Sequence, residues 1–273
     1  MPDTNTTTKL LRARVTDDSD YGSPDSLNKI LRLMARWRTQ LLANTYIRHH
    51  GLKIFSGPFE GMEYLNYATE GCLVPRLIGC YESELHGDLA DFAQSGIDTI
   101  VDIGCAEGYY AVGLARLMPG ATVHAFDIDE RARSACADLA ARNGVQDRVI
   151  IKGEFVGEMF EDFADRKTLV IIDAEGFEDV IMRPDLYPGL TRLNIIVETH
   201  PGLKRGVFDR MLERFTPSHD IVIRKQGPKT MPLPAWLQDL GHLDQLLAVW
   251  EFRSTMTPWL VMKPRASLEN NRT

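Results

Sequence analysis

The chain has 273 residues, of which 44% are hydrophobic and 25% charged, as is ordinary for a soluble globular protein. Its formal net charge of −7 argues against broad binding to nucleic-acid phosphates, which depends on clustered Lys and Arg. We therefore expect no nucleic acid as partner, although the overall charge leaves a local basic patch open. The four cysteines form neither a CxxC pair nor a metal-finger spacing, which favours a reducing, cytoplasmic location. No signal peptide and no transmembrane segment is expected.

The N-terminal region divides into a polar stretch and a helix. Residues 1–25 are rich in Thr, Asp, Ser and Pro, which predicts a disordered or loosely ordered arm. From Ser26 to about His49, apolar residues recur every three or four positions, as in a helix. The cations among them are Lys29, Arg32, Arg36 and Arg38. They form either a solvated helix face or a contact for an acidic substrate or partner.

An irregular stretch follows this helix. Alternating apolar residues broken by glycines and a proline predict a short hairpin over 52–65. A helix is expected over 81–95, where Gly96 ends it. We therefore assign 26–96 to an N-terminal extension made of a helix, a hairpin and a helix.

From residue 97 short apolar strands alternate with helices. Strands are predicted at 98–103, 121–127, 147–152, 168–173, 193–199, 219–225 and 258–263. Helices are predicted at 108–117, 130–142, 176–182, 204–214 and 237–251. This alternation predicts an α/β, Rossmann-like, doubly wound and mostly parallel seven-stranded sheet. The domain is expected to span 97–264, with a C-terminal tail over 265–273.

The first of these strands leads into a glycine-rich turn and then a helix, which is typical of a nucleotide-binding corner. A dinucleotide fingerprint requires G-x-G-x-x-G, but Tyr109 occupies the third glycine position. No Gly-Lys-Ser/Thr follows, so the turn is not a phosphate-binding P-loop. Two interpretations of the turn remain as alternatives: a nicotinamide enzyme, and a Rossmann-like domain whose glycines only make the turn.

The spacing Asp-x-Gly-x-Ala-x-Gly resembles motif I of class I S-adenosylmethionine (SAM)-dependent methyltransferases. The resemblance implies that SAM is the cofactor and that small residues let the backbone pass close to it. Asp102 would hold the ammonium group of SAM through a charge-assisted hydrogen bond. The implied cofactor-binding residues of this turn are Asp102, Gly104, Cys105, Ala106, Glu107 and Gly108.

The next two strand ends complete the expected cofactor site. Asp127 ends the second strand and would accept hydrogen bonds from the ribose hydroxyls, with Ile128 beside it and Asp129 as the substitute. Glu154 and Phe155 follow the third strand, where this class often contacts adenine. Glu154 has the alternative of lying on the surface.

A second motif follows the fourth strand. The run Asp173-Ala-Glu-Gly-Phe-Glu178 resembles the Ile-Asp-Val-Glu-Gly-x-Glu hallmark of the FkbM group of methyltransferases, with Ala174 in place of Val. The strand that ends in Glu198-Thr-His200 is similar to the fifth strand of that group. The resemblance covers residues 52–200. It implies O-methylation, since members are mostly associated with sugars, polysaccharides and natural products.

Candidate catalytic residues lie at the carboxyl ends of these strands, where substrates of doubly wound sheets bind. His200 is the preferred general base because its unperturbed pKa lies near neutrality, although a histidine that only caps the strand is the alternative. Asp173 is expected to orient the substrate or the methionine end of SAM. Glu175 is a candidate for the site as well, but Glu175 and Glu178 would also stabilise the start of a helix.

A metal-dependent mechanism is the less favoured alternative. Asp173 and Glu198 would end adjacent strands, and their oxygens suit Mg²⁺. The sequence identifies no third ligand, so we expect no metal. Tyr81 and Glu82 are candidates to close over SAM from the extension.

The sequence thus predicts a SAM-dependent O-methyltransferase that acts on a saccharide or a small hydroxylated metabolite. An N-methyltransferase and a non-catalytic SAM-binding or scaffold protein are the alternatives. The helix over 26–49 could pack on its own domain or on a second subunit, so a homo-oligomer is left open.

Overall fold

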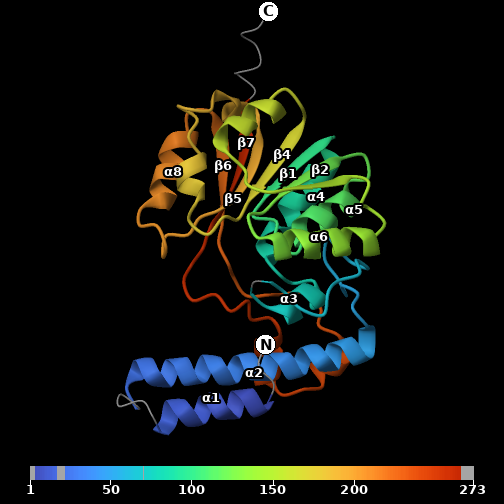
Figure 1. The fold of residues 1–273 in the computed structure, drawn as a ribbon, viewed down its shortest axis with the longest axis vertical. Coiled ribbons are helices and arrows are strands. Elements are labelled where there is room, and N and C mark those ends of the chain that lie inside the picture. Colours follow the sequence, from blue (N-terminus) through green and yellow to red (C-terminus); the bar gives the residue numbers. More distant parts are fainter. Residues whose placement is uncertain (1–3, 17–21, 70, 266–273) are drawn as a thin grey trace, which may run out of the picture.

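The computed structural model describes residues 4–16, 22–69 and 71–265. Its centre is a seven-stranded sheet of order β3-β2-β1-β4-β5-β7-β6 (Figure 1). Strand β7 runs antiparallel to both of its neighbours, and the other strand pairs are parallel. The strands are β1 (Thr99–Ile103), β2 (Thr122–Phe126), β3 (Val149–Lys152), β4 (Thr168–Ile172), β5 (Asn194–Glu198), β6 (His219–Arg224) and β7 (Trp259–Pro264). The predicted α/β, mostly parallel, seven-stranded sheet is confirmed.

Helices cover both faces of the sheet, because successive side chains of a strand point to opposite faces. Ile100 and Ile171 belong to a core with α4 (His86–Gln94), α5 (Tyr109–Leu117) and α6 (Glu130–Arg142). Val101 and Val170 belong to a second core on the other face. That core includes η2 (Gly157–Phe163), α7 (Glu178–Ile181), η3 (Pro188–Arg192) and α8 (Val207–Phe215). This double burial explains why the strands are almost continuously apolar.

Three predicted elements of the connecting regions differ from the structure. The hairpin expected over 52–65 has a single antiparallel bridge between Lys53 and Glu63. The helix expected over 81–95 is a short turn, η1 (Ser83–Leu85), followed by α4. The helix expected over 237–251 is divided into α9 (Ala235–Gln238) and α10 (His242–Ala248). Helix α3 (Leu73–Ile78), which was not predicted, is short and almost wholly buried, so it shows no helical alternation of polar and apolar residues.

The polar N-terminal region contains a helix, which corrects the prediction of a disordered or loosely ordered arm over 1–25. Helix α1 (Thr4–Thr16) packs on α2 (Pro24–His50), and the Trp37 indole donates a hydrogen bond to the Thr4 hydroxyl at 3.1 Å. Only Thr7 of α1 is buried, so the stripe that contacts α2 is too narrow to produce an apolar pattern. The rest of the predicted arm, at 1–3 and 17–21, lies outside the described residues, as does the tail beyond 265.

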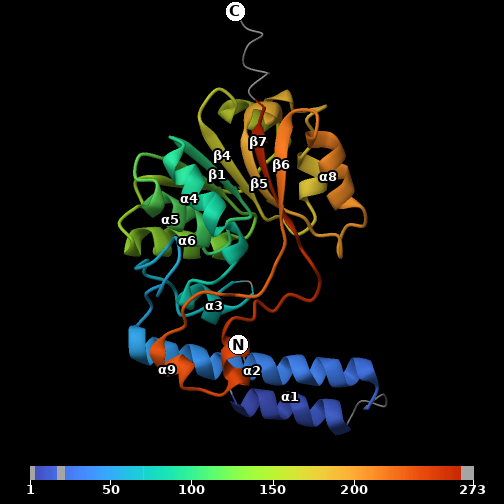
Figure 2. The same ribbon diagram turned by 180° about the vertical axis from the view of Figure 1, so that it is seen from behind.

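The α1–α2 hairpin, which we define as residues 4–50, lies at one end of the molecule, below α3 in both views (Figures 1 and 2). Helix α2 contacts α3 and α10, and Arg38 forms an ion pair with Asp244 of α10 at 2.6 Å. The predicted helix over 26–49 is therefore confirmed and packs on its own chain. No helix in the described part of the chain combines the length and the apolar character needed to cross a membrane.

Candidate functional site

The glycine-rich turn after β1 passes directly against the backbone at the end of β4. Gly104 has φ +82°, and a Cβ atom there would lie 1.8 Å from the carbonyl oxygen of Asp173. Gly108 has φ +95°, and a Cβ there would lie 2.8 Å from the Cys136 sulfur. Only glycine fits both positions, because other residues add a Cβ and rarely adopt this backbone. The predicted strand, turn and helix are therefore present, and the turn brings the first motif against the second.

A cavity of about 630 Å³ opens at the carboxyl ends of β1, β4 and β5. Its walls come from the glycine turn, from both predicted motifs, from α2 and from the segment 251–257. The residues that matter below are Arg36, Tyr81, Asp102, Gly104, Asp173, Glu175, Glu198, His200, Phe252 and Arg253. The volume lies in the usual range for small-molecule sites.

Asp102 is a buried carboxylate with spare hydrogen-bonding capacity. Its side chain is 2% exposed, and among the described residues Oδ2 has no hydrogen-bond partner. Burial and, to a smaller extent, the charge of Asp127 raise the pKa of Asp102 to about 7, against the opposing effect of a hydrogen bond from the Ala111 backbone. An unsatisfied buried carboxylate is costly, so this position is suited to a cationic group of a ligand.

The predicted ribose-binding residue lies beside the same turn. The Asp127 carboxylate accepts hydrogen bonds from the backbone N–H groups of Ala106 and Asp129, at 2.9 and 2.8 Å. Asp129 itself accepts from Arg131 N–H and caps α6, so it does not serve as the substitute. Ile128 is 82% exposed, which leaves its side chain free to contact a ligand.

Three candidate cofactor residues have side chains that serve packing instead. The Glu107 carboxylate accepts hydrogen bonds from Tyr64 and Thr69 and pairs with Arg76 at 3.0 Å. Its acceptor positions are thus filled from the N-terminal extension, which it fastens to the turn. Cys105 and Phe155 are both buried in the hydrophobic core. Cys105 and Glu107 nevertheless line the cavity, so the role of these residues in cofactor binding stays a prediction.

The two residues expected near adenine, Glu154 and Phe155, lie in different environments in the structure. Phe155 packs edge-on against Phe126 with ring centroids 5.0 Å apart. Glu154 is exposed, as in the surface alternative, and neither residue lines the cavity.

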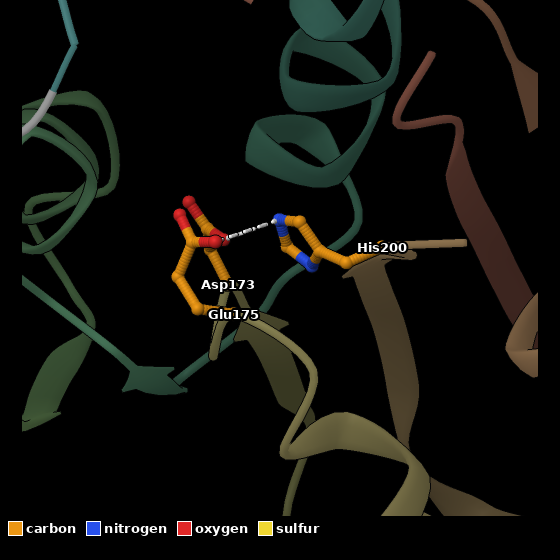
Figure 3. A group of neighbouring side chains, drawn as sticks. All are labelled: Asp173, Glu175 and His200. Carbon is orange, nitrogen blue, oxygen red and sulfur yellow. Dashed lines mark ion pairs between the residues drawn. The ribbon is translucent and has the colours of Figure 1, made fainter. Parts of the chain in front are cut away.

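The second motif gathers carboxylates around His200 (Figure 3). Nδ1 of His200 lies 2.9 Å from Glu178 Oε1. Nε2 lies 3.5 Å from Asp173 Oδ1, 3.8 Å from Glu175 Oε2 and 3.4 Å from Glu198 Oε2. The structure therefore brings together all three predicted catalytic residues.

These neighbours decide the protonation state of His200. Burial lowers its pKa, but hydrogen bonds and charge from Glu178, Glu198 and Asp173 outweigh burial and raise the pKa to about 10. At neutral pH the imidazole is therefore already protonated and cannot accept a proton. The role of His200 as general base, which assumed the pKa of an isolated histidine, stays a prediction that these carboxylates disfavour.

The pKa of Asp173 is raised as well. Burial, together with the charges of Glu198 and Glu82, raises the pKa of Asp173 well above its ordinary value. Its Oδ1 is buried and lacks a hydrogen-bond partner among the described residues. A carboxylate of raised pKa is a better proton acceptor than an ordinary one.

Glu178 holds the histidine in place. Its fully buried carboxylate also accepts hydrogen bonds from the backbone N–H groups of Gly176 and His200, at 2.7 and 3.1 Å. It therefore positions His200 and the β4 loop together. Glu175, with φ +47°, lies on the bend of that loop.

Sequence reasoning missed Arg253, which joins three buried carboxylates. Its guanidinium donates to Glu82, Glu198 and Glu251. Burial and the charge of Glu198 raise the pKa of Glu82 to about 8, against the opposing effect of Arg253. Glu82 also accepts from Tyr110, so it closes the cavity wall as part of this network. These partners are up to 171 residues apart, and no local pattern relates them.

Backbone strain concentrates around the same cavity. In the described ranges, the non-glycine residues with positive φ are Glu82, Ala106, Glu175 and Phe252. The last three line the cavity, and Glu82 bonds to Arg253 in its wall. Such strained residues tend to cluster at active sites and ligand-binding sites, where the surrounding fold maintains them.

One group of side chains has the spacing of a metal site. Ligand atoms of Asp173, Glu175 and His200 all lie within 4.8 Å of one another. Glu198, the second predicted ligand, is bound by Arg253 instead. The group adds Glu175 and His200, which the sequence did not identify as ligands. The protonated imidazole lies within ion-pair distance of the same two carboxylates, those of Asp173 and Glu175.

The strand order, with β7 alone antiparallel, is that of the class I SAM-dependent methyltransferase fold. No family model matches the chain. A tRNA1(Val) (adenine(37)-N6)-methyltransferase from Bacteroides thetaiotaomicron is 28% identical over 146 residues, which are 53% of this chain. The chain spans 55% of that relative's length.

Solved structures resemble the chain only distantly. The O-methyltransferase TomG from Streptomyces achromogenes, in complex with SAM, has 13% identity and a TM-score of 0.48, covering 84% of this chain and 90% of its own. The human methyltransferase 10 domain containing protein has 12% identity and a TM-score of 0.49, covering 82% and 95%. TrmN from Thermus thermophilus has 16% identity and a TM-score of 0.45, covering 72% and 55%. These likenesses carry no argument about function.

Proposed function

We propose that this chain is a SAM-dependent methyltransferase that methylates a hydroxyl group of a saccharide or a small metabolite. One observation carries the proposal. The unsatisfied carboxylate of Asp102 and the proton-accepting carboxylate of Asp173 border the same cavity, on either side of the Gly104 turn.

The residues present fit SAM. Asp102 would hold the ammonium group, the Asp127 carboxylate would meet the ribose, and Ile128 would cover one face of the adenine. Bound SAM supplies a methyl group made electrophilic by the sulfonium. The carboxylates of this cavity favour its positive charges over a neutral or anionic cofactor.

The chain's own residues then activate the acceptor. Asp173 Oδ1 takes the proton that the acceptor hydroxyl loses as it attacks the methyl carbon. A positioned base of this kind contributes about 10²–10⁴-fold to a rate. The His200 imidazolium, fixed by Glu178, would form an ion pair with Asp173, whose Oδ1 lies 3.5 Å from Nε2.

N-methylation is the second candidate, and two observations favour it. The relative from Bacteroides thetaiotaomicron is named for methylation of an adenine nitrogen. His200 is protonated, and a neutral amine needs less help from a base than a hydroxyl does. An N-methyltransferase would retain most of its activity in Asp173→Asn, whereas an O-methyltransferase would not.

Isothermal titration of the full chain tests the cofactor. We expect SAM to bind the wild type and Asp147→Asn, an exposed control, with equal affinity, and to bind Asp102→Asn more weakly. Clear NADH binding without SAM binding would overturn the proposal. SAM binding without turnover on any acceptor would identify a non-catalytic SAM-binding protein.

A separate measurement tests the metal. Full activity after dialysis against EDTA would exclude a metal at Asp173, Glu175 and His200.

A further inference from the structure

The charges of this acidic chain are unevenly distributed. Residues 4–50 contain eight Lys and Arg against four Asp, whereas the rest of the chain contains 23 Lys and Arg against 34 Asp and Glu. The α1–α2 hairpin is therefore a basic region attached to a strongly acidic body. Its cations are Lys9, Arg12, Arg14, Lys29, Arg32, Arg36, Arg38 and Arg48.

Several of these cations have no acidic neighbour. Lys29 pairs with Asp25, and Arg38 pairs with Asp244. By contrast, across residues 4–16, 22–69 and 71–265 no carboxylate forms an ion pair with Lys9, Arg12 or Arg32, and all three are exposed. The buried cations Arg76 and Arg253 of the body, by contrast, are paired with acids. The unpaired ones are available to an anionic partner.

The hairpin is continuous with the cavity. Arg36 lines the cavity, and its guanidinium carbon lies 5.3 Å from the centre of the Phe252 ring. Helix α2 has 27 residues, so it is about 40 Å long. A partner that lies along α2 can therefore contact several cations and still place one group in the cavity.

From this arrangement we propose that the α1–α2 hairpin is the docking surface for an RNA acceptor. The inference rests on the proposed SAM-dependent methyl transfer and names RNA as the acceptor in place of a saccharide or a small metabolite. Phosphates would lie along Lys9, Arg12 and Arg32, while the acidic body repels them from the rest of the surface. A single nucleotide would then enter past Arg36 and Phe252, which offer a guanidinium and a ring for stacking.

The chemistry of the surface favours RNA over two other anionic or saccharide partners. A neutral saccharide makes no use of a row of unpaired cations. A membrane-bound amphipathic helix needs a broad apolar face, whereas the exposed Leu10, Leu27 and Leu31 are separated by charged residues. RNA supplies both a continuous row of phosphates and the ribose hydroxyls or base amines that the cavity could methylate.

Fluorescence anisotropy of the full chain with a labelled 20-nucleotide single-stranded RNA tests the proposal. With three to five phosphates contacted, affinity should fall about 20- to 130-fold between 50 and 200 mM NaCl. Arg12→Glu/Arg32→Glu should flatten the slope of log affinity against log salt by about 1.4 or more. The matched control, Arg131→Glu/Arg166→Glu, changes two exposed cations of the body and should leave the slope unchanged.

The remaining outcomes separate this inference from the proposed function. Equal loss of RNA affinity in both double variants would overturn the docking surface, because net charge alone would then explain binding. Binding of phosphatidylserine vesicles without binding of RNA would overturn it as well. SAM titration of each variant confirms that the protein is folded. If SAM binds and RNA does not, only this inference fails; if SAM does not bind, the proposed function fails.

Discussion

The α1–α2 hairpin and the catalytic body differ in the sign and the burial of their charged side chains. In the body, Asp102, Asp173 and Glu198 lie in or beside a cavity and have perturbed pKa values. On the hairpin, Arg12 and Arg32 are exposed and have no acidic partner in the described ranges. Buried charges are expensive unless they are paired or meet a ligand, whereas exposed charges cost little.

The contrast separates two tasks. The body maintains strained backbone and unsatisfied carboxylates, which are the features of a site prepared for a cationic cofactor. The hairpin offers charge without strain, which suits attraction of a partner more than chemistry. Substitutions at the cavity should therefore affect cofactor binding or turnover by orders of magnitude, whereas substitutions on the hairpin should leave cofactor binding unchanged.

The largest effect is expected from Gly104→Val. Its side chain would overlap the Asp173 carbonyl at a backbone conformation that valine rarely adopts. We expect no detectable SAM binding by calorimetry and a loss of at least about 3 kcal/mol in the free energy of unfolding. Gly120→Val is the control, because a Cβ at Gly120 meets no atom within 4 Å. Normal SAM binding by Gly104→Val would show that the turn is not the cofactor site.

Asp173→Asn should next affect turnover. The amide cannot accept the acceptor's proton, so kcat should fall about 10²–10⁴-fold. The SAM dissociation constant should stay within about threefold, and Asp147→Asn should match the wild type in both measurements. If the variant keeps most of its kcat, then either another residue is the base or the acceptor is an amine.

Asp102→Asn should weaken SAM binding but stabilise the free protein. Loss of a charge-assisted hydrogen bond of about 1.5–3 kcal/mol corresponds to roughly 10- to 150-fold weaker binding. The folded-state pKa of about 7 exceeds the ordinary value of 3.8, so the folded state binds the proton more tightly than the unfolded chain does. Wild-type stability from this group is therefore lost as pH rises from about 4 to 7.

Denaturant unfolding at pH 4, 5.5 and 7 without SAM checks that sign. The stability advantage of Asp102→Asn over the wild type should grow with pH, towards an upper bound of about 4 kcal/mol. A constant or shrinking advantage would contradict the raised pKa of Asp102.

Trp37→Phe should have the smallest effect. It removes the exposed hydrogen bond to Thr4, so the free energy of unfolding should fall by about 1 kcal/mol or less. SAM affinity should equal that of the wild type, as measured by calorimetry. A clear loss of SAM binding would show that the hairpin and the cofactor site are coupled, which would break the division of tasks.

Part of the predicted site agrees with the structure, and individual residues show why. Asp102, Gly104 and Asp173 lie where their motifs placed them, because a strand end followed by a tight turn orients the backbone locally. The motif did not reveal the partners of Glu107, whose carboxylate accepts hydrogen bonds from Tyr64 and Thr69 and pairs with Arg76. Partners so distant along the chain leave no mark on a local motif.

The sheet and its cofactor corner followed from local patterns, because continuous apolar strands and obligatory glycines depend mainly on neighbouring residues. The protonation of His200 and the role of Arg253 depended on tertiary contacts, because a pKa is determined by every charge nearby in space. The excess of cations over residues 4–50 is present in the sequence despite the overall charge of −7, but only the packing of α1 on α2 and the contact of Arg36 with the cavity place these cations beside the site, because such contacts join distant parts of the chain.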